Sequence, residues 1–240
     1  KDIQYVDFEV TDMTEANNHP RDTFMLSLKN IEKQSFESGD LFAVRPLNIG
    51  EERMYSIGKG PNGEVILYIK KHPRGICSQF LSEQIIGSLI KGRIISNPKF
   101  HVPKRFKSLI LISNGTGIAP FMGMINENNH KGDIHLFWGG ASKEDYSLYE
   151  NKLIQMQEDG KITSVKTIFS EEEKSYVQDL IIKNKNLIGK EIQRGASIMV
   201  CGSLVMEKAV YSSLENICAE SQLRDMTYYK SRGRFKTDCY

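Results

Sequence analysis

The fold of this chain is decided by residues 109–121, which read Leu109-Ile110-Leu111-Ile112-Ser113-Asn114-Gly115-Thr116-Gly117-Ile118-Ala119-Pro120-Phe121. The four apolar residues at the start predict a strand that is buried on both faces. Gly115 and Gly117 let the backbone approach a ligand, and the helix predicted after them offers free N–H groups to a phosphate. Pro120 replaces the third glycine of the usual dinucleotide-binding pattern. The stretch therefore predicts a nucleotide-binding turn, although a tight strand-to-helix turn without a ligand remains an alternative for the glycines alone.

The rest of the second half continues this alternation of strands and helices. Strands are predicted near residues 134–138, 165–169 and 198–201, and helices near 148–157, 177–183 and 205–219. Such alternation implies a parallel sheet with crossover helices. We therefore expect an α/β nucleotide-binding domain over residues 106–240.

The first half has a different pattern, in which short strands are separated by turn residues. Strands are predicted at residues 5–10, 23–28, 41–45, 53–58 and 65–70, followed by a helix near 76–84. Short, frequent strands with turns between them are typical of a small antiparallel β-barrel. We expect this barrel domain over residues 1–105, with the seam between the two domains near residues 97–107.

Composition sets wider limits on the class of protein. The 240 residues are 26% charged with a net charge of +2, which gives no nucleic-acid-binding footprint. No run is long enough for a transmembrane helix and no signal peptide is recognisable, so we expect a cytoplasmic protein. Because the chain starts at Lys1 rather than Met, a longer protein with a further domain or a membrane anchor is also open. The four cysteines have neither CxxC nor metal-ligand spacing, so free thiols and no metal site are expected: Cys77, Cys201, Cys218 and Cys239.

Two further motifs lie in the first half. In Arg53-Met54-Tyr55-Ser56, alternation along a strand puts Arg53 and Tyr55 on one face, where they can neutralise a diphosphate and stack on a planar ring. In Gly75-Ile76-Cys77-Ser78-Gln79-Phe80-Leu81, a glycine leads into a helix start that can bind an anion. A surface arginine with a packed tyrosine, and an ordinary capped helix, are the alternatives.

These motifs, together with Cys201-Gly202-Ser203, resemble the ferredoxin-NADP reductase family in order and spacing. The resemblance implies a six-stranded FAD-binding barrel followed by a nicotinamide-nucleotide domain. It is greatest to the reductase part of diflavin enzymes such as the sulfite reductase flavoprotein, whose carboxyl terminus the segment 233–240 also resembles. The chain departs from those enzymes in two ways. Only about seven residues separate Pro46 from Arg53, so the large helical connecting domain is missing, and these 240 residues contain no FMN domain.

The resemblance also assigns roles to residues. Tyr55 would pack on the flavin ring, Ser56 would lie near its N5, and Tyr240 would cover the opposite face. The implied catalytic set is Ser56, Cys201 and Asp238. The other implied cofactor-binding residues are Arg53, Ile57, Gly75, Ile76, Cys77, Ser78, Gly115, Thr116, Gly117, Pro120, Gly202 and Ser203, and an adenosine-phosphate pocket of Ser170, Lys174, Tyr176 and Gln178.

The choice between NADH and NADPH stays open at this level. The four pocket residues favour NADPH, but Glu171 stands where NADPH-specific relatives usually have arginine, and Glu172 and Glu173 follow it. A carboxylate beside a dianionic phosphate costs about 1 kcal/mol or more.

The function implied by the resemblance is FAD-dependent reduction by NAD(P)H, with electrons passed to a flavodoxin-like or FMN domain, a ferredoxin, or a haem or iron–sulfur protein. A non-catalytic nucleotide-binding regulatory subunit is the alternative, against which the retained Arg53, Tyr55 and Ser56 argue. A basic stretch near the seam is either a docking site for an acidic acceptor or a solvated linker: Lys99, Lys104, Arg105 and Lys107.

Overall fold

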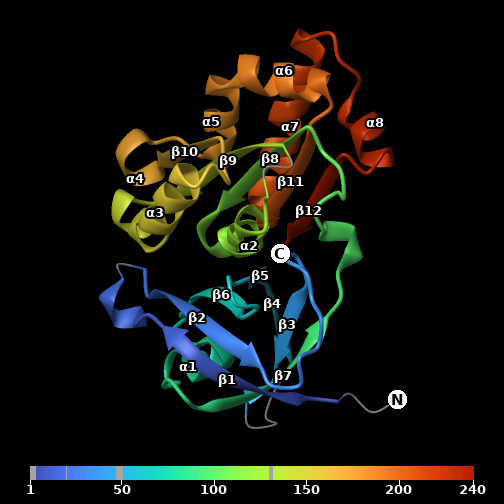
Figure 1. Cartoon of the computed structure of the whole chain (residues 1–240). Coiled ribbons are helices and arrows are strands. Elements are labelled where there is room, and N and C mark those ends of the chain that lie inside the picture. Colours follow the sequence, from blue (N-terminus) through green and yellow to red (C-terminus); the bar gives the residue numbers. More distant parts are fainter. Residues whose placement is uncertain (1–3, 20, 47–50, 130–131) are drawn as a thin grey trace. The chain divides into compact units, whose positions relative to one another are not determined.

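The computed structural model describes residues 4–19, 21–46, 51–129 and 132–240 (Figure 1). Contacts divide the chain into two compact units. The N-terminal unit consists of Lys1–His101 together with Ala119–Glu127, and the C-terminal unit consists of Val102–Ile118 and Asn128–Tyr240. The segment 119–127 thus packs with the first half of the sequence although it follows a strand of the second half.

The N-terminal unit is built on one antiparallel sheet. Its strands are β1 (Val6–Met13), β2 (Thr23–Asn30), β3 (Leu41–Val44), β4 (Arg53–Ser56), β5 (Gly58–Lys59), β6 (Val65–Lys70) and β7 (Leu89–Ile95). Their order is β4-β3-β7-β1-β2-β6-β5. Only Ile57 separates β4 from β5, yet these strands occupy opposite ends of the order, so the sheet curls into an open barrel. Counted as one bent strand, β4 and β5 reduce the seven strands to the predicted six, and the antiparallel barrel-like domain is confirmed.

The core of this barrel explains why β7 was missed in the sequence. Phe8 on β1 and Phe42 on β3 pack edge to face with ring centroids 4.9 Å apart. Strand β7 passes over the Phe42 ring at Gly92, where a Cβ atom would overlap the ring. Gly92 and its charged neighbours Lys91 and Arg93 interrupt the alternation of apolar and polar residues along β7. The alternation that predicts the other strands is therefore missing there.

Short helices complete the N-terminal unit. They are η1 (Ala16–Asn18), α1 (Ile76–Ser82), η3 (Pro98–Phe100) and α2 (Ala119–Asn126). Helix α2 is buried along most of its length and contacts η3 through Phe121 and Phe100, whose ring centroids are 6.0 Å apart. The predicted helix near residues 76–84 is α1.

The C-terminal unit has a five-stranded sheet in which every neighbouring pair is parallel. Its strands are β8 (Ser108–Asn114), β9 (Asp133–Gly140), β10 (Ser164–Phe169), β11 (Ser197–Gly202) and β12 (Phe235–Cys239). The order β10-β9-β8-β11-β12 reverses direction at β8, and such switch points are where open α/β sheets place their ligands. The parallel α/β architecture expected for the second half is confirmed.

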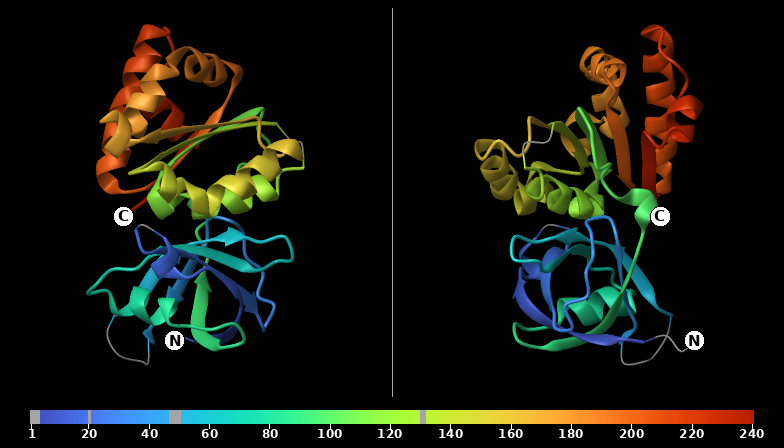
Figure 2. Two further views of the ribbon diagram at one scale, coloured as in Figure 1. Left: turned by 90° about the vertical axis from the view of Figure 1, so that its left-hand side faces the viewer. Right: turned by 45° about the vertical axis from the view of Figure 1, so that its right-hand side comes forward.

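Helices cover both faces of this sheet (Figure 2). They are η4 (Gly115–Ile118), α3 (Lys143–Glu158), α4 (Ser170–Glu173), α5 (Val177–Lys183), α6 (Lys185–Arg194), α7 (Leu204–Glu220) and α8 (Met226–Ser231). Residues of α5, α6 and α7 form a buried cluster with Phe137 and Val200 on one face, whereas α3 packs on Trp138 from the other. Helices α6 and α8 and strand β12 were not predicted, because their few buried residues are interspersed with charged ones.

Two general properties of the chain follow from the structure. All four cysteines are free, and all but Cys239 are buried. Within the described ranges, no helix is long and apolar enough to cross a membrane.

A bidentate ion pair fastens the beginning of strand β4. The Glu52 carboxylate accepts hydrogen bonds from Arg93 Nε at 2.8 Å and Nη2 at 2.7 Å, and from the Tyr5 hydroxyl at 2.7 Å. Since Arg93 lies on β7, the pair reaches across β3 and holds the end strand to the body of the sheet. The hydrogen bond from Arg93 lowers the pKa of Glu52.

We predict that Glu52→Gln lowers the free energy of unfolding by about 1 kcal/mol at pH 7, as expected for a partly exposed bidentate pair. Because the folded-state pKa is depressed, the stabilisation is complete above the unfolded pKa of about 4.3 and is lost as the pH falls through the folded value. Urea unfolding from pH 7 to pH 3 should therefore show a constant difference between wild type and variant down to about pH 5, and a shrinking one below. Glu9→Gln, whose exposed carboxylate makes only a 3.9 Å pair with Lys29, is the control. A difference that persisted unchanged to pH 3 would contradict the assignment.

Candidate functional site

The glycine loop, Gly115–Ile118, follows β8 at the switch point of the parallel sheet. Gly115 has φ +51°, a conformation that glycine adopts without strain. A Cβ atom at Gly117 would overlap the carbonyl oxygen of Cys201 and would lie 2.8 Å from Gly202 Cα. The loop therefore rests directly on the backbone at the end of β11, which only glycine permits.

Two residues that the sequence analysis left without a role support this loop. The indole N–H of Trp138 donates a 3.0 Å hydrogen bond to the carbonyl of Gly115. Asn114 Oδ1 accepts a 3.1 Å hydrogen bond from the backbone N–H of Ser203, and its amide group fills the space where a Cβ atom of Gly202 would be. The available signals were that Trp138 is the single tryptophan of the chain and ends a buried strand, and that Asn114 lies within the quoted stretch.

The thiol and the carboxylate of the predicted catalytic set come together on neighbouring strands. Cys201 is fully buried, and its register partners are Ser113 on β8 and Asp238 on β12. The side chains of register partners on parallel strands share a face of the sheet. The structure thus places Cys201 and Asp238 side by side at the carboxyl edge, and Ser113, the partner of Cys201 on β8, lies two residues before the glycine loop.

The last residue of the chain lies at the same edge. The N–H of Tyr240 donates a 3.0 Å hydrogen bond to the carbonyl of Gly202, which continues the pairing of β12 with β11. A side-chain hydrogen bond links Tyr240 to Thr116 in the glycine loop, while 66% of Tyr240 remains exposed. The carboxyl terminus is therefore an ordered part of this edge.

The side chain of Ser203 also has a structural partner. Its Oγ accepts a 3.3 Å hydrogen bond from the N–H of Met206 and caps helix α7. The backbone of Gly202 and Ser203 thereby connects the sheet edge to a capped helix.

The four residues of the expected adenosine-phosphate pocket surround the turn after β10. Ser170 begins α4, Lys174 is exposed with φ +53°, Tyr176 is 60% exposed, and Gln178 lies in the first turn of α5. Glu172 and Glu173, which lie beside these residues, make contacts within the fold. Glu172 accepts a 3.3 Å hydrogen bond from the N–H of Lys143, and Glu173 pairs with Lys183 at 3.1 Å.

In the N-terminal unit, the residues of strand β4 become more buried from Arg53 to Ser56. The Arg53 side chain is exposed, Tyr55 packs partly against the barrel core, and Ser56 is buried. Ile57 is fully buried and exchanges backbone hydrogen bonds with the segment Gly39–Asp40. These contacts fix the strand that carries the predicted flavin-binding residues.

The start of α1 lies against this strand. Cys77 is buried and its thiol donates a 3.9 Å hydrogen bond to the carbonyl of Val44. Burial raises the pKa of the Cys77 thiol, and the charge and backbone N–H of Arg53 lower it, so the two motifs are adjacent. Ser78 Oγ donates to the carbonyl of Gly75 and accepts from the N–H of His72, each at 3.0 Å. Because both side chains have partners within the fold, an anion at this helix start would be bound by backbone N–H groups.

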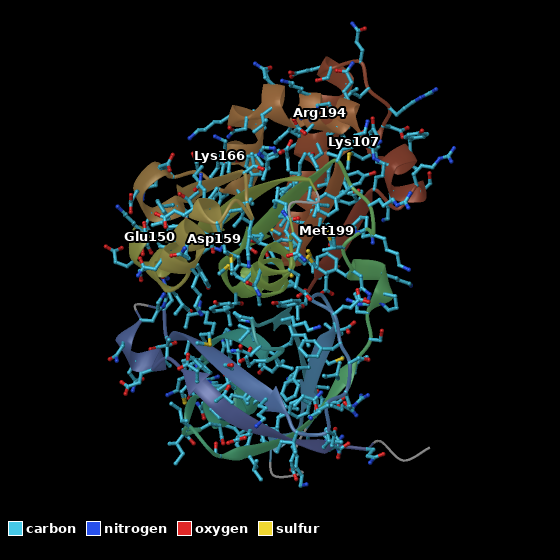
Figure 3. The ribbon with its side chains drawn as sticks, viewed as in Figure 1. Lys107, Glu150, Asp159, Lys166, Arg194 and Met199 are labelled. Carbon is cyan, nitrogen blue, oxygen red and sulfur yellow. The ribbon has the colours of Figure 1, made fainter. Side chains whose placement is uncertain are left out.

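Pro120, which the sequence placed in the cofactor-binding set, and two basic residues lie apart from these regions. Pro120 is buried in α2, within the N-terminal unit. Lys107 and Arg194 lie at the opposite, amino-terminal edge of the parallel sheet (Figure 3), where Arg194 is 3.6 Å from Asp133. Among the residues that the structure describes, no group of three or more acidic, histidine or cysteine side chains could hold a metal ion.

Chemically, each unit offers groups that could bind a ligand of its own. The C-terminal unit combines a backbone cradle at a switch point with a buried thiol and a carboxylate. The N-terminal unit combines an exposed guanidinium, a half-buried aromatic ring and a helix start.

Comparison with known proteins supports the same description. Residues 111–212 match the family described as oxidoreductase NAD-binding domain. The nitric oxide synthase of Anopheles stephensi is 32% identical over 212 residues, which are 77% of this chain and 17% of that protein. The sulfite reductase flavoprotein alpha-component of Shewanella oneidensis is 31% identical over 180 residues, which are 69% of this chain and 30% of that protein.

A third relative is similar over most of the chain. The NADPH-dependent diflavin oxidoreductase 1 of Kluyveromyces lactis is 28% identical over 213 residues, or 81% of this chain and 33% of that protein. The chain thus spans a third or less of the length of these three relatives. The resemblance stated from the motifs is confirmed, and the chain belongs to the ferredoxin-NADP reductase family.

Proposed function

We propose that this chain is the FAD- and nicotinamide-nucleotide-binding reductase module of an electron-transfer flavoprotein, which takes electrons from NAD(P)H and passes them to a separate acceptor. The observation that carries the proposal is the backbone contact of Gly117 with Cys201, which forms a nucleotide cradle directly beside a buried thiol. The matched oxidoreductase NAD-binding domain, residues 111–212, includes both residues.

The C-terminal unit fits a nicotinamide nucleotide. The glycine loop has no side chain at Gly115 or Gly117 to block a phosphate, and Trp138 and Asn114 hold its backbone in place. A preorganised loop loses little conformational entropy on binding. Ser170, Lys174, Tyr176 and Gln178 would contact the adenosine end of the nucleotide, at the turn after β10.

The N-terminal unit fits FAD. Arg53 and the N–H groups of Ile76–Ser78 would hold the pyrophosphate, and Tyr55 would stack on the flavin ring. Ser56 would hydrogen-bond near the flavin N5. When bound, the two cofactors supply the hydride chemistry, and the protein supplies orientation and exclusion of water.

Ser56, Cys201 and Asp238 form the proposed catalytic set. Cys201 is fully buried, so its thiol presents a small, fixed surface against the nicotinamide. Asp238, its register neighbour, provides a carboxylate that can hold a proton near the same position. Tyr240, ordered by its bond to Gly202, would cover the flavin until a nicotinamide takes its place.

The acceptor is proposed to be a separate protein or domain, such as a flavodoxin-like domain, a ferredoxin or a haem protein. Relatives include a sulfite reductase flavoprotein component and a diflavin oxidoreductase. The four basic residues near the seam are exposed and make no ion pair with another described residue, which supports an acidic acceptor surface: Lys99, Lys104, Arg105 and Lys107. A cytoplasmic location fits this role.

Anaerobic stopped-flow reduction of the FAD-loaded protein tests the proposal. We expect either NADH or NADPH to bleach the flavin absorbance within seconds, because both cofactors bind in a preorganised site. Dithionite reduction serves as the control that the bound flavin is competent. A protein that binds no FAD, or whose flavin dithionite reduces but neither nucleotide does, would favour the non-catalytic nucleotide-binding subunit.

We predict that Cys201→Ala slows reduction by saturating nucleotide about tenfold or more, because the cavity left beside the nicotinamide lets the ring move away from its reactive position. The FAD content should stay unchanged. Cys218→Ala is the matched control, since this buried thiol contacts Met226 in the core of the same unit. Equal rates for the two variants would remove Cys201 from the catalytic set.

We predict that Glu171→Arg raises the preference for NADPH over NADH about tenfold, because an unfavourable carboxylate is replaced by a guanidinium that pairs with the 2′-phosphate. The ratio of the reduction rates with limiting NADPH and NADH measures the preference. Glu158→Arg carries the same charge change at the other end of α3, about 20 Å along the helix from its first residue Lys143, whose N–H contacts Glu172. An unchanged ratio in Glu171→Arg would show that this residue does not read the phosphate.

A further inference from the structure

The chain passes from one unit to the other immediately after the glycine loop. The loop ends at Ile118 in the C-terminal unit, and α2 begins at Ala119 in the N-terminal unit. The chain returns to the C-terminal unit at Asn128. Helix α2 is therefore a segment of the nucleotide-binding half of the sequence that packs on the barrel.

Helix α2 meets strand β5 without side chains between the two backbones. A Cβ atom added at Gly58 would overlap the carbonyl oxygen of Ala119 and would lie 3.0 Å from the backbone nitrogen of Gly123. A Cβ atom at Gly123 would lie 2.7 Å from Gly58 Cα and closer still to the backbone nitrogen of Lys59. Apart from Ser38 Oγ, which would also overlap a Cβ atom at Gly123, these obstructing atoms belong to backbone, which cannot rotate away as a flexible side chain can.

Polar contacts fasten the end of the same helix. Ser38 Oγ accepts a 3.0 Å hydrogen bond from the N–H of Lys59 and donates a 2.8 Å one to Glu127. The ammonium group of Lys59 lies 3.8 Å from the other oxygen of Glu127. The seat of α2 on β5 is thus defined by backbone packing and by a hydrogen-bonded serine.

This seat links the flavin strand to the glycine loop through short peptide segments and one backbone packing contact. On one side, Gly58 follows Ser56 of the flavin strand with only the buried Ile57 between them. On the other side, Ala119 directly follows the loop whose Gly117 rests on Cys201. The route from Ser56 to Cys201 therefore contains two glycine contacts and few rotatable bonds.

Resting on the proposed function, we infer that Gly58 and Gly123 are positioning residues for electron transfer between the nucleotide and the flavin. By seating α2 on β5 backbone to backbone, they set the place at which the glycine loop presents its nucleotide. Ordinary contacts of a Cβ atom begin near 3.4 Å, so a methyl group at Gly123 requires a separation greater by more than half an ångström. A misplacement of about 1 Å can slow a reaction about 100-fold.

The test is Gly123→Ala in the full chain, loaded with FAD and reduced anaerobically by the nucleotide that reduces the wild type. We expect the limiting rate of flavin reduction at saturating nucleotide to fall about tenfold to 100-fold. The FAD content and the dissociation constant of the nucleotide should change less than about threefold, because the loop itself is untouched. The long-wavelength absorbance of a stacked flavin–nicotinamide pair should weaken in parallel.

Gly189→Ala is the matched control. Gly189 lies within helix α6, and its added Cβ atom would meet the Ser221 hydroxyl oxygen at 2.7 Å, a side-chain atom that can rotate away, so the variant carries the same chemical change in a helix of the C-terminal unit. We expect it to keep the wild-type rate. Ser38→Ala removes the hydrogen bonds of Ser38 to Lys59 and Glu127 without adding atoms, and it should lower the limiting rate about threefold. This variant replaces Gly123→Ala in the test if Gly123→Ala does not fold.

An unchanged limiting rate in a folded Gly123→Ala, or a loss of nucleotide affinity at an unchanged rate, overturns the inference. So does a wild-type rate in Ser38→Ala where Gly123→Ala does not fold. A wild type that neither nucleotide reduces is a different result, because it rejects the proposed function itself before any variant is compared.

Discussion

The contact that the rest of the candidate site depends on is the approach of the Gly117 backbone to the end of strand β11. Strands β8 and β11 are neighbours at the switch point of the sheet. The loop after β8 can turn back over β11 only if no side chain stands between the two backbones. The same edge needs glycine at position 202, where the amide of Asn114 occupies the space of a Cβ atom. The shape of the cradle therefore depends on two positions without a side chain, Gly117 and Gly202.

A large aromatic side chain makes that cradle rigid. Trp138 packs against Tyr146, Tyr149 and Phe169, with ring centroids 5.4, 5.6 and 6.4 Å away. Its indole fits because Gly140 leaves room for the ring. The buried ring then directs its N–H at the carbonyl of Gly115. The packing of Trp138 under α3 therefore also fixes the position of the glycine loop. Such support keeps a binding loop ordered before a ligand binds.

The sequence predicts those parts of the fold whose residues repeat with the period of a strand or helix. Strand β6 and helix α5 have the predicted bounds because their buried residues are continuous or regularly spaced. Strand β7 was missed because Gly92 makes room for Phe42, and α2 could not be assigned to the barrel because backbone atoms make its contact. In the site, the motifs located the glycine loop and strand β4, yet Trp138 and Asn114 act through tertiary hydrogen bonds that no local pattern reveals. The motif alone predicted that Cys77 and Ser78 contact a ligand, whereas their side chains make hydrogen bonds within the fold.

In the proposed site, recognition of the nucleotide would be divided between backbone groups and side chains, and these two parts could change independently. The loop at Gly115–Ile118 would contact what all nicotinamide nucleotides share, and its close approach to β11 depends on Gly117, which leaves no room for a side chain. The turn at α4 would contact what distinguishes NADPH from NADH, and its residues lie on the surface. There, Glu172 and Glu173 already hold Lys143 and Lys183, so their charges serve the fold. The backbone N–H of Glu171 donates a hydrogen bond to the carbonyl of Ala141, which ties this residue to the segment that follows β9. Because this turn follows β10 and the glycine loop follows β8, selection between the two nucleotides would act at the turn without changing the cradle.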